Sequence, residues 1–186
     1  MKYVPTRIPD VVEIFPDVFE DDRGYFMESF RCDSFEKNIG KKIVFCQDNE
    51  SFSTKNTLRG LHYQLPPYAQ NKLVRVVHGT VLDVAVDIRK HSPTFMQYVA
   101  VELSAAKKNQ LFIPAGFAHG FVVRSNTALF LYKVDAPYAP AKERCLLFSD
   151  PDIGIDWGGK HDTFLVSKKD AAGKRLREMD DIFEDE

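Results

Sequence analysis

The sequence lacks the features of secreted, membrane-spanning and nucleic-acid-binding proteins. Its cysteines number only three and never form a C-x-x-C pair, so we expect reduced thiols of a cytoplasmic protein and no disulfide framework. The first residues show no signal-peptide pattern, and no apolar run approaches the length of a membrane span. A net charge of −2 offers no basic surface for phosphate backbones. We therefore expect neither membrane nor nucleic-acid binding.

Signatures of nucleotide loops and redox cofactors are also weak. Residues 154–161 fit the pattern G-x-x-x-x-G-K, but His161 stands where a magnesium-binding Ser or Thr belongs. Trp157 is too bulky for a loop whose backbone wraps phosphate, so an ordinary turn is expected here. No G-x-G-x-x-G occurs, which argues against a dinucleotide site.

The chain is instead rich in short β-branched and aromatic runs separated by turn residues. Such spacing predicts an all-β sandwich or barrel, and 186 residues with 44% apolar content suit a single domain over residues 1–186. Short helices are predicted only from a capping-box pattern at Asp33 and from Ser167. The acidic end, from residue 178, is predicted to be a solvated tail. The predicted strands are 11–15, 25–30, 43–52, 58–64, 72–78, 81–88, 98–103, 110–113, 120–124, 128–134 and 144–148.

The most informative segment places charged residues among apolar ones. Arg59, His62 and Lys72 lie in strand-like sequence rich in Leu and Val, where charges are costly unless paired or used. A histidine flanked by fixed cations predicts a base beside an anion-binding site. Arg59 and His62 have opposite parity in a regular strand, and a bulge at Gly60 would aim both inward; the sequence leaves this open.

One motif points to a particular β architecture. Residues 114–119 read P-x-G-x-x-H and resemble the second motif of the cupins, a superfamily of double-sheet jelly rolls. The first cupin motif is H-x-H followed by a glutamate, and this chain keeps only one of its residues, His62. The two motifs together therefore retain two histidines, His62 and His119. Catalytic metal sites generally use three protein ligands, so we expect a cupin scaffold without a metal.

Further blocks occur along nearly the whole chain in a fixed order: 22–28, 46–49, 58–64, 72–76, 83–89, 112–120, 130–133, 138–140, 152–157 and 167–170. Together they resemble the dTDP-4-dehydrorhamnose 3,5-epimerase family. The resemblance implies an all-β, double-sheet jelly-roll barrel with short helical turns and no cofactor. It also implies a homodimer in which N-terminal segments such as 22–28 complete the partner's site.

The activity implied by the resemblance is epimerisation of dTDP-4-dehydro-6-deoxy-D-glucose at C3 and C5, giving dTDP-4-dehydro-L-rhamnose for dTDP-rhamnose biosynthesis. Such a reaction removes a proton beside a ketone and returns one on the opposite face, so it needs a base, an acid and donors to the enolate oxygen. Residues 134–137 depart from the family pattern. A C3-only epimerase or a ketoisomerase therefore remains an alternative, as do a metal-dependent oxygenase and a non-catalytic sugar-binding module.

His62 is the candidate base, since imidazole titrates near ~6.5. The resemblance assigns Asp170 as its partner, and strand parity makes Asp83 a second candidate. The resemblance also implies Tyr132 as the acid and Lys72 as the donor to the enolate oxygen. Positions that match substrate-binding ones in the family are Arg23, Glu28, Gln47, Asn49, Arg59, Lys72, His119, Tyr138, Glu143 and Lys169.

Overall fold

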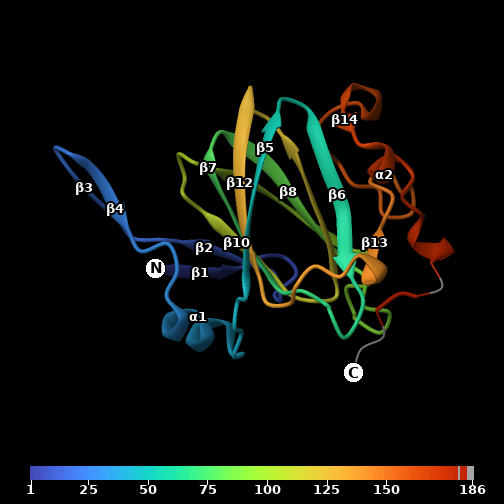
Figure 1. Ribbon diagram of the computed structural model, residues 1–186, viewed down its shortest axis with the longest axis horizontal. Coiled ribbons are helices and arrows are strands. Elements are labelled where there is room, and N and C mark those ends of the chain that lie inside the picture. Colours follow the sequence, from blue (N-terminus) through green and yellow to red (C-terminus); the bar gives the residue numbers. More distant parts are fainter. Residues whose placement is uncertain (180, 184–186) are drawn as a thin grey trace.

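The computed structural model describes residues 1–179 and 181–183. Two β-sheets face each other and a small hairpin projects to one side (Figure 1). The first sheet is antiparallel, in the order β1 (Lys2–Pro5), β2 (Val12–Phe15), β10 (Gln110–Ile113), β7 (Lys72–His78), β12 (Thr127–Val134) and β5 (Gln47–Thr54).

The second sheet runs in the order β13 (Glu143–Cys145), β6 (Thr57–Gln64), β11 (Phe117–Val123), β8 (Thr80–Asp87) and β9 (Tyr98–Ser104). These strands are also antiparallel, and the short β14 (Leu165–Val166) adds to β6 in parallel. The projecting hairpin is formed by β3 (Val18–Asp21) and β4 (Gly24–Met27). This arrangement confirms the predicted double-sheet, cupin-like fold.

Helices are few and short, as predicted. They are α1 (Cys32–Ile39), α2 (Lys168–Ala171) and the 3₁₀ turns η1 (Pro140–Lys142), η2 (His161–Thr163) and η3 (Leu176–Glu178). Ser167 caps α2 as expected, its hydroxyl accepting a hydrogen bond from the Asp170 N–H at 3.1 Å. The capping box at Asp33 is wrong: α1 begins at Cys32, two residues before the start that Asp33 would cap, and the Asp33 carboxylate instead accepts a hydrogen bond from Arg31 at 2.7 Å.

Burial on both faces of β8 explains why the second sheet forms the centre of the molecule. Val81 and Ala85 pack between the two sheets, whereas Val84 and Val86 pack under the C-terminal segment. That segment is fixed by Trp157, which is 1% exposed and donates its indole N–H to the Phe148 carbonyl at 2.8 Å. The predicted turn at 154–161 is therefore a loop that covers the sheet.

The prediction of a solvated C-terminal tail is only partly right. Met179 is buried in the cluster under the second sheet, and Phe183 forms a parallel bridge with Arg89. Residues 180 and 184–186 lie outside the described part of the chain. Strands β1, β3 and β14 were not predicted. Among the described residues, no helix combines the length and the apolar character needed to cross a membrane.

Candidate active site

A cavity of about 530 Å³ is lined by residues of both sheets, among them β6 and β12, and by residues of α2. Its lining includes most of the residues that the sequence singled out. They come from β6, β7, β11 and β12 and from the C-terminal segment, and they are Arg59, His62, Lys72, His119, Tyr132, Tyr138, Glu143, Lys169 and Asp170. The structure thus gathers residues that are up to 111 positions apart, Arg59 and Asp170, in one place.

An irregularity in β6 brings Arg59 and His62 to the same cavity. The register between β6 and β11 shifts there, because His62 pairs with His119 whereas Arg59 pairs with Phe121. Gly60 lies at the shift with φ of +117°, and a Cβ at this position would stand 2.6 Å from the Gly120 Cα. Only glycine permits this conformation and this close approach of two backbones. The bulge that the sequence left open is therefore present.

His62 forms a short hydrogen bond with Asp170, 2.6 Å between Nε2 and Oδ1. The Gly60 N–H donates to the other carboxylate oxygen at 3.4 Å, so the bulge and the Ser167 cap both orient Asp170. Burial raises the pKa of Asp170, but its bonds to His62 outweigh burial and hold this pKa below the usual range. A neutral ring that donates Nε2–H to Asp170 keeps Nδ1 as its basic nitrogen.

Tyr132 belongs to β12 and thus to the opposite sheet from His62. Burial raises the pKa of its phenol above the ordinary value of 10.0, while the charge of Arg59 opposes this shift. The hydroxyl therefore carries its proton at neutral pH. A base and a potential acid thus face one cavity from two different sheets.

A second charged cluster lies next to His62. Lys72 is buried, with 7% of its surface exposed, and its Nζ donates to the His62 carbonyl at 3.3 Å. Burial lowers the pKa of Lys72 to about 8, against the opposing charges of Asp83 and Glu143. Asp83 itself bonds His119, 2.9 Å between Oδ1 and Nε2. Asp83 is therefore the partner of His119, and of the two candidate partners for His62 the structure selects Asp170.

Two buried polar atoms in the described residues lack a hydrogen-bond partner, Asp83 Oδ2 and Ser51 Oγ. Ser51 lines the cavity but was not predicted. The strand alternation offered a signal, because Ser51 on β5 shares its face with Gln47 and Asn49. Buried polar atoms are normally satisfied, so the Ser51 hydroxyl, which lines the cavity, is available to a ligand or to water.

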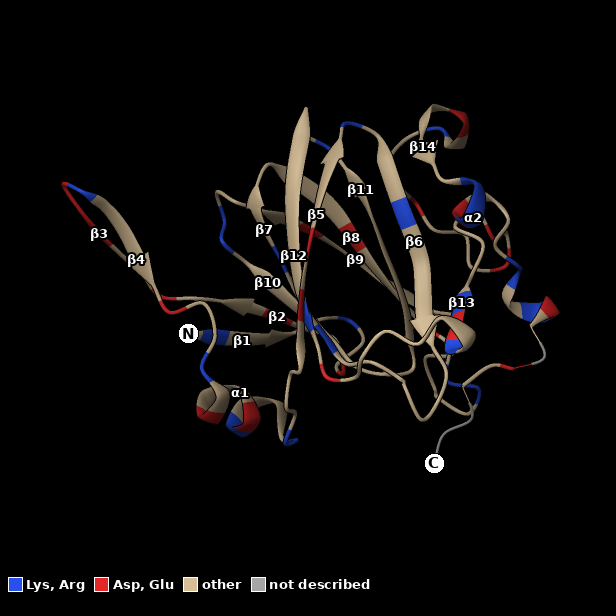
Figure 2. Ribbon diagram, viewed as in Figure 1, with Lys and Arg blue, Asp and Glu red and all other residues tan. Residues whose placement is uncertain are grey.

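The rim of the cavity carries charged and aromatic side chains. Tyr138, which is 55% exposed, donates its hydroxyl to Glu143 at 2.8 Å, and Lys169 forms an ion pair with the same carboxylate. Arg59 is oriented from β5 by the Ser53 hydroxyl, at 2.9 Å. In Figure 2 the basic segments of β6 and α2 lie near each other on this side of the molecule. Cationic side chains next to an exposed aromatic ring suit a ligand that joins an anionic group to a flat aromatic group.

Four predicted residues lie elsewhere in this chain. Arg23 sits on the projecting hairpin, bonded to Asp21 at 2.6 Å, and Glu28 follows the hairpin, 3.9 Å from Arg31. Gln47 donates to Asn49 at 2.7 Å. None of these residues lines the cavity described above.

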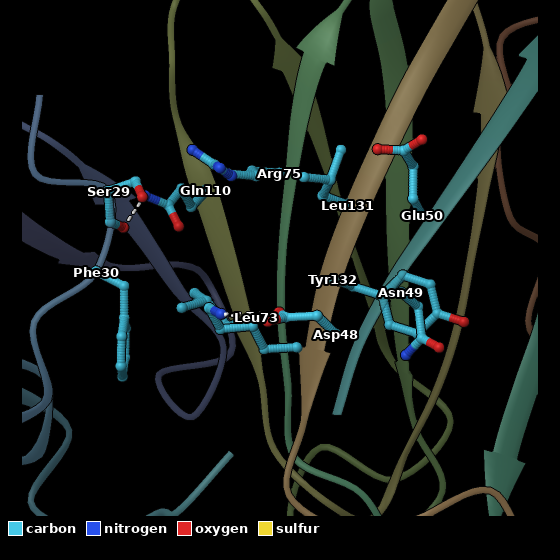
Figure 3. Close-up of a pocket in the computed structure, with 11 residues that line it drawn as sticks. Ser29, Phe30, Asp48, Asn49, Glu50, Leu73, Arg75, Gln110, Leu131 and Tyr132 are labelled. Atoms are coloured by element: carbon cyan, nitrogen blue, oxygen red, sulfur yellow. Dashed lines mark hydrogen bonds and ion pairs between the residues drawn. The ribbon is translucent and has the colours of Figure 1, made fainter. Parts of the chain in front are cut away.

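A second cavity, of about 340 Å³, includes Asn49 and Tyr132 in its lining (Figure 3). Most of its other side chains occupy outward-facing positions of the first sheet, such as Arg75 and Leu131. Lys133 is already paired there with Asp48 at 2.7 Å. This second cavity lacks the histidine and the buried lysine, so the cavity between the sheets is the better candidate for chemistry.

Known proteins resemble this chain in sequence and in fold. A family model described as dTDP-4-dehydrorhamnose 3,5-epimerase matches residues 5–178. The dTDP-4-dehydrorhamnose 3,5-epimerase of Shigella flexneri is 54% identical over 180 residues, which cover 97% of this chain and 98% of the relative.

Solved structures are also similar. The dTDP-6-deoxy-D-glucose-3,5-epimerase of Legionella pneumophila, in complex with dTDP-4-keto-L-rhamnose, has a TM-score of 0.93 at 46% identity, covering 96% of this chain and 94% of its own. ChmJ, a 3'-monoepimerase from Streptomyces bikiniensis in complex with dTDP-quinovose, has a TM-score of 0.87 at 32% identity, covering 94% and 87%. The chain belongs to the dTDP-4-dehydrorhamnose 3,5-epimerase family.

Proposed function

We propose that this protein epimerises dTDP-4-dehydro-6-deoxy-D-glucose at C3 and C5 and so forms dTDP-4-dehydro-L-rhamnose for rhamnose biosynthesis. The observation that carries the proposal is the pairing of His62 with Asp170 on one side of a cavity whose other side presents Tyr132. Relatives at about half identity over nearly the full length carry the same activity in their names. Cofactor-free proton transfer accounts for the reaction with side chains alone.

In the proposed mechanism, His62 Nδ1 removes the proton from the carbon beside the ketone. The electron pair of the broken C–H bond moves to the carbonyl oxygen, and the resulting enolate is stabilised by the Lys72 ammonium group. Tyr132 then donates its proton to the opposite face of the carbon. Proton exchange with solvent returns His62 and Tyr132 to their starting forms, and the cycle repeats at the second carbon.

For substrate binding, we assign the diphosphate to Arg59 and Lys169 and the thymine ring to Tyr138. Guanidinium and ammonium groups form charge-assisted bonds to phosphate oxygens, and an aromatic face suits a nucleobase. His119, Gln47, Asn49 and Glu143 remain predicted substrate contacts. The complex of the Legionella pneumophila relative with dTDP-4-keto-L-rhamnose supports a dTDP-sugar as the ligand class.

We further propose a cytoplasmic homodimer. The projecting hairpin carries Phe19 and Phe26, which are 64% and 69% exposed. Paired apolar side chains on a projecting hairpin favour docking against another surface. A second copy of this chain would receive the hairpin, and Arg23 and Glu28 would then reach the partner's substrate.

A C3-only epimerase is the nearest alternative, since the monoepimerase ChmJ shares this fold. Incubation of the 4-keto sugar with the enzyme in heavy water separates the two, because each carbon that is epimerised acquires deuterium. We expect deuterium at both C3 and C5, measured by NMR and mass spectrometry. Label at C3 alone would establish the alternative, and no label at either carbon would overturn epimerisation altogether.

A further inference from the structure

Cys145 lies next to the His62–Asp170 pair but has no part in the proposed reaction. In the register of β13 with β6, Cys145 stands directly opposite His62. Its Sγ is 4.0 Å from Asp170 Oδ1, the same oxygen that His62 Nε2 contacts at 2.6 Å. The three ligand atoms lie within 4.8 Å of one another, and no other such trio of metal-ligating side chains occurs among residues 1–179 and 181–183.

We propose that Cys145, His62 and Asp170 form an inhibitory site for a thiophilic divalent cation, with Zn²⁺ as the best fit. Thiolate, imidazole and carboxylate are the donors that Zn²⁺ uses in proteins, whereas Mg²⁺ and Ca²⁺ prefer oxygen ligands. Water would occupy the fourth tetrahedral position. The binding site stands on the observed cluster alone, and only its inhibitory consequence rests on the proposed function.

The three donors need only small shifts to bind the cation. Zn–S bonds of about 2.3 Å and Zn–N and Zn–O bonds of about 2.1 Å, at tetrahedral angles, place S and O about 3.6 Å apart and N and O about 3.4 Å apart. The observed Cys145–Asp170 separation of 4.0 Å must close slightly and the His62–Asp170 separation of 2.6 Å must open. Rotation of the Cys145 and Asp170 side chains supplies movements of this size.

A separate cavity of about 580 Å³ leads to Cys145 from outside the substrate cavity. It includes Cys145, Asp181 and Lys174, but neither His62 nor Asp170. The ion pair of Glu143 with Lys169 lines both cavities and therefore lies between them. A cation can thus approach the thiol while the dTDP-sugar occupies its own cavity.

Coordination would disable the base through its tautomer. A cation on Nε2 displaces the proton that this nitrogen shares with Asp170, and that proton must sit on Nδ1, the nitrogen that removes the substrate proton. The thiol releases its own proton to solvent on coordination. Because burial raises the pKa of Cys145 to about 12, the loss of this proton makes binding weaker than at a dedicated structural zinc site.

Cobalt titration of the metal-free protein tests the site without any substrate. Co²⁺ bound to a thiolate gives a charge-transfer absorption in the near ultraviolet. We expect this band at one equivalent per chain, displacement of the band by Zn²⁺, and loss of the band in Cys145→Ser. Cys46→Ser is the matched control, because Cys46 is exposed and lies outside the cluster.

Kinetics test the inhibition. We expect Zn²⁺ to lower kcat reversibly with KM unchanged, and Cys145→Ser to require at least about tenfold more Zn²⁺ for the same inhibition. Retention of the cobalt band in Cys145→Ser, or no band in the unmodified protein, would overturn the metal site while leaving the epimerase proposal intact. A cobalt band in a protein that has no epimerase activity would instead contradict the proposed function and leave the metal site intact. Cys145→Ala serves as a second variant if the serine destabilises β13.

Discussion

The described residues contain two histidine–aspartate pairs whose histidines lie on adjacent strands of one sheet, and the pairs differ in accessibility. The side chain of His62 is 31% exposed and faces the cavity, with Asp170 supplied by a separate helix. The side chain of His119 is only 8% exposed, and Asp83 is completely buried. Burial lowers the pKa of His119 and raises the pKa of Asp83. The same two residue types therefore form one pair whose histidine is open to the cavity and one pair that is almost completely enclosed.

The largest effect should come from breaking the accessible pair. Asp170→Asn keeps the size of the side chain but favours the wrong tautomer of His62, so we expect kcat to fall by about 10³- to 10⁴-fold, as tautomer loss does in other histidine–aspartate enzymes. Steady-state kinetics measures this loss, and thermal unfolding checks that the fold is retained. A decrease of only a few-fold would show that Asp170 does not set the tautomer.

Lys72, which lies between the two pairs, should reveal a conflict between stability and function. The lowering of its pKa from 10.5 to about 8 corresponds to about 3 kcal/mol of destabilisation at neutral pH. Lys72→Met should therefore raise the free energy of unfolding by up to about 3 kcal/mol while turnover falls by about 10²- to 10³-fold. Urea denaturation and kinetics on the same preparation measure the two effects.

The pH dependence of stability supplies the control for this variant. Because the folded pKa of Lys72 lies below its unfolded value, its destabilising effect is complete below about pH 8 and disappears as the pH approaches 10.5. The advantage of Lys72→Met should therefore shrink over that range. An advantage that stays constant between pH 7 and 10 would mean that the charge of Lys72 is not what destabilises the fold.

The buried pair, His119 and Asp83, should affect the pKa of Lys72 rather than the base His62. The negative charge of Asp83 raises the pKa of Lys72, so Asp83→Asn should lower that pKa further below about 8. The alkaline decline of kcat/KM, which follows loss of the Lys72 proton, should then begin at lower pH, with a rate loss of about tenfold at neutral pH. An unchanged pH profile of kcat/KM would mean that Asp83 does not influence the pKa of Lys72. Lys72→Arg stays charged and should remove the alkaline decline of kcat/KM.

The smallest effect is expected at Ser51, whose buried hydroxyl has no partner in the described residues. Ser51→Ala should raise KM by about three- to tenfold with kcat nearly unchanged, as expected for the loss of one hydrogen bond to bound substrate. Ser53→Ala provides a comparison, because Ser53 orients Arg59 and should affect diphosphate binding instead. Equal KM values for Ser51→Ala and the unmodified enzyme would mean that water alone satisfies this hydroxyl.

Much of the fold followed from patterns that are local in sequence. Strands 72–78 and 110–113 were predicted with their observed bounds, because apolar runs flanked by turn residues specify them. The family and its epimerase activity are confirmed by the comparisons. The roles assigned to individual residues remain predictions, as do the single domain, the homodimer and the cytoplasmic location.

Alternation and motif blocks in the sequence alone determined a double-sheet fold, the family and the residue types of a proton-transfer site. Only the tertiary structure decided which aspartate meets which histidine. Asp83 lies 21 residues from His62 and Asp170 lies 108 residues away, yet the bulge at Gly60 and the cap at Ser167 select the distant one. A one-residue shift in a strand changes which face a side chain occupies, so such pairings depend on register and helix placement that sequence patterns do not specify.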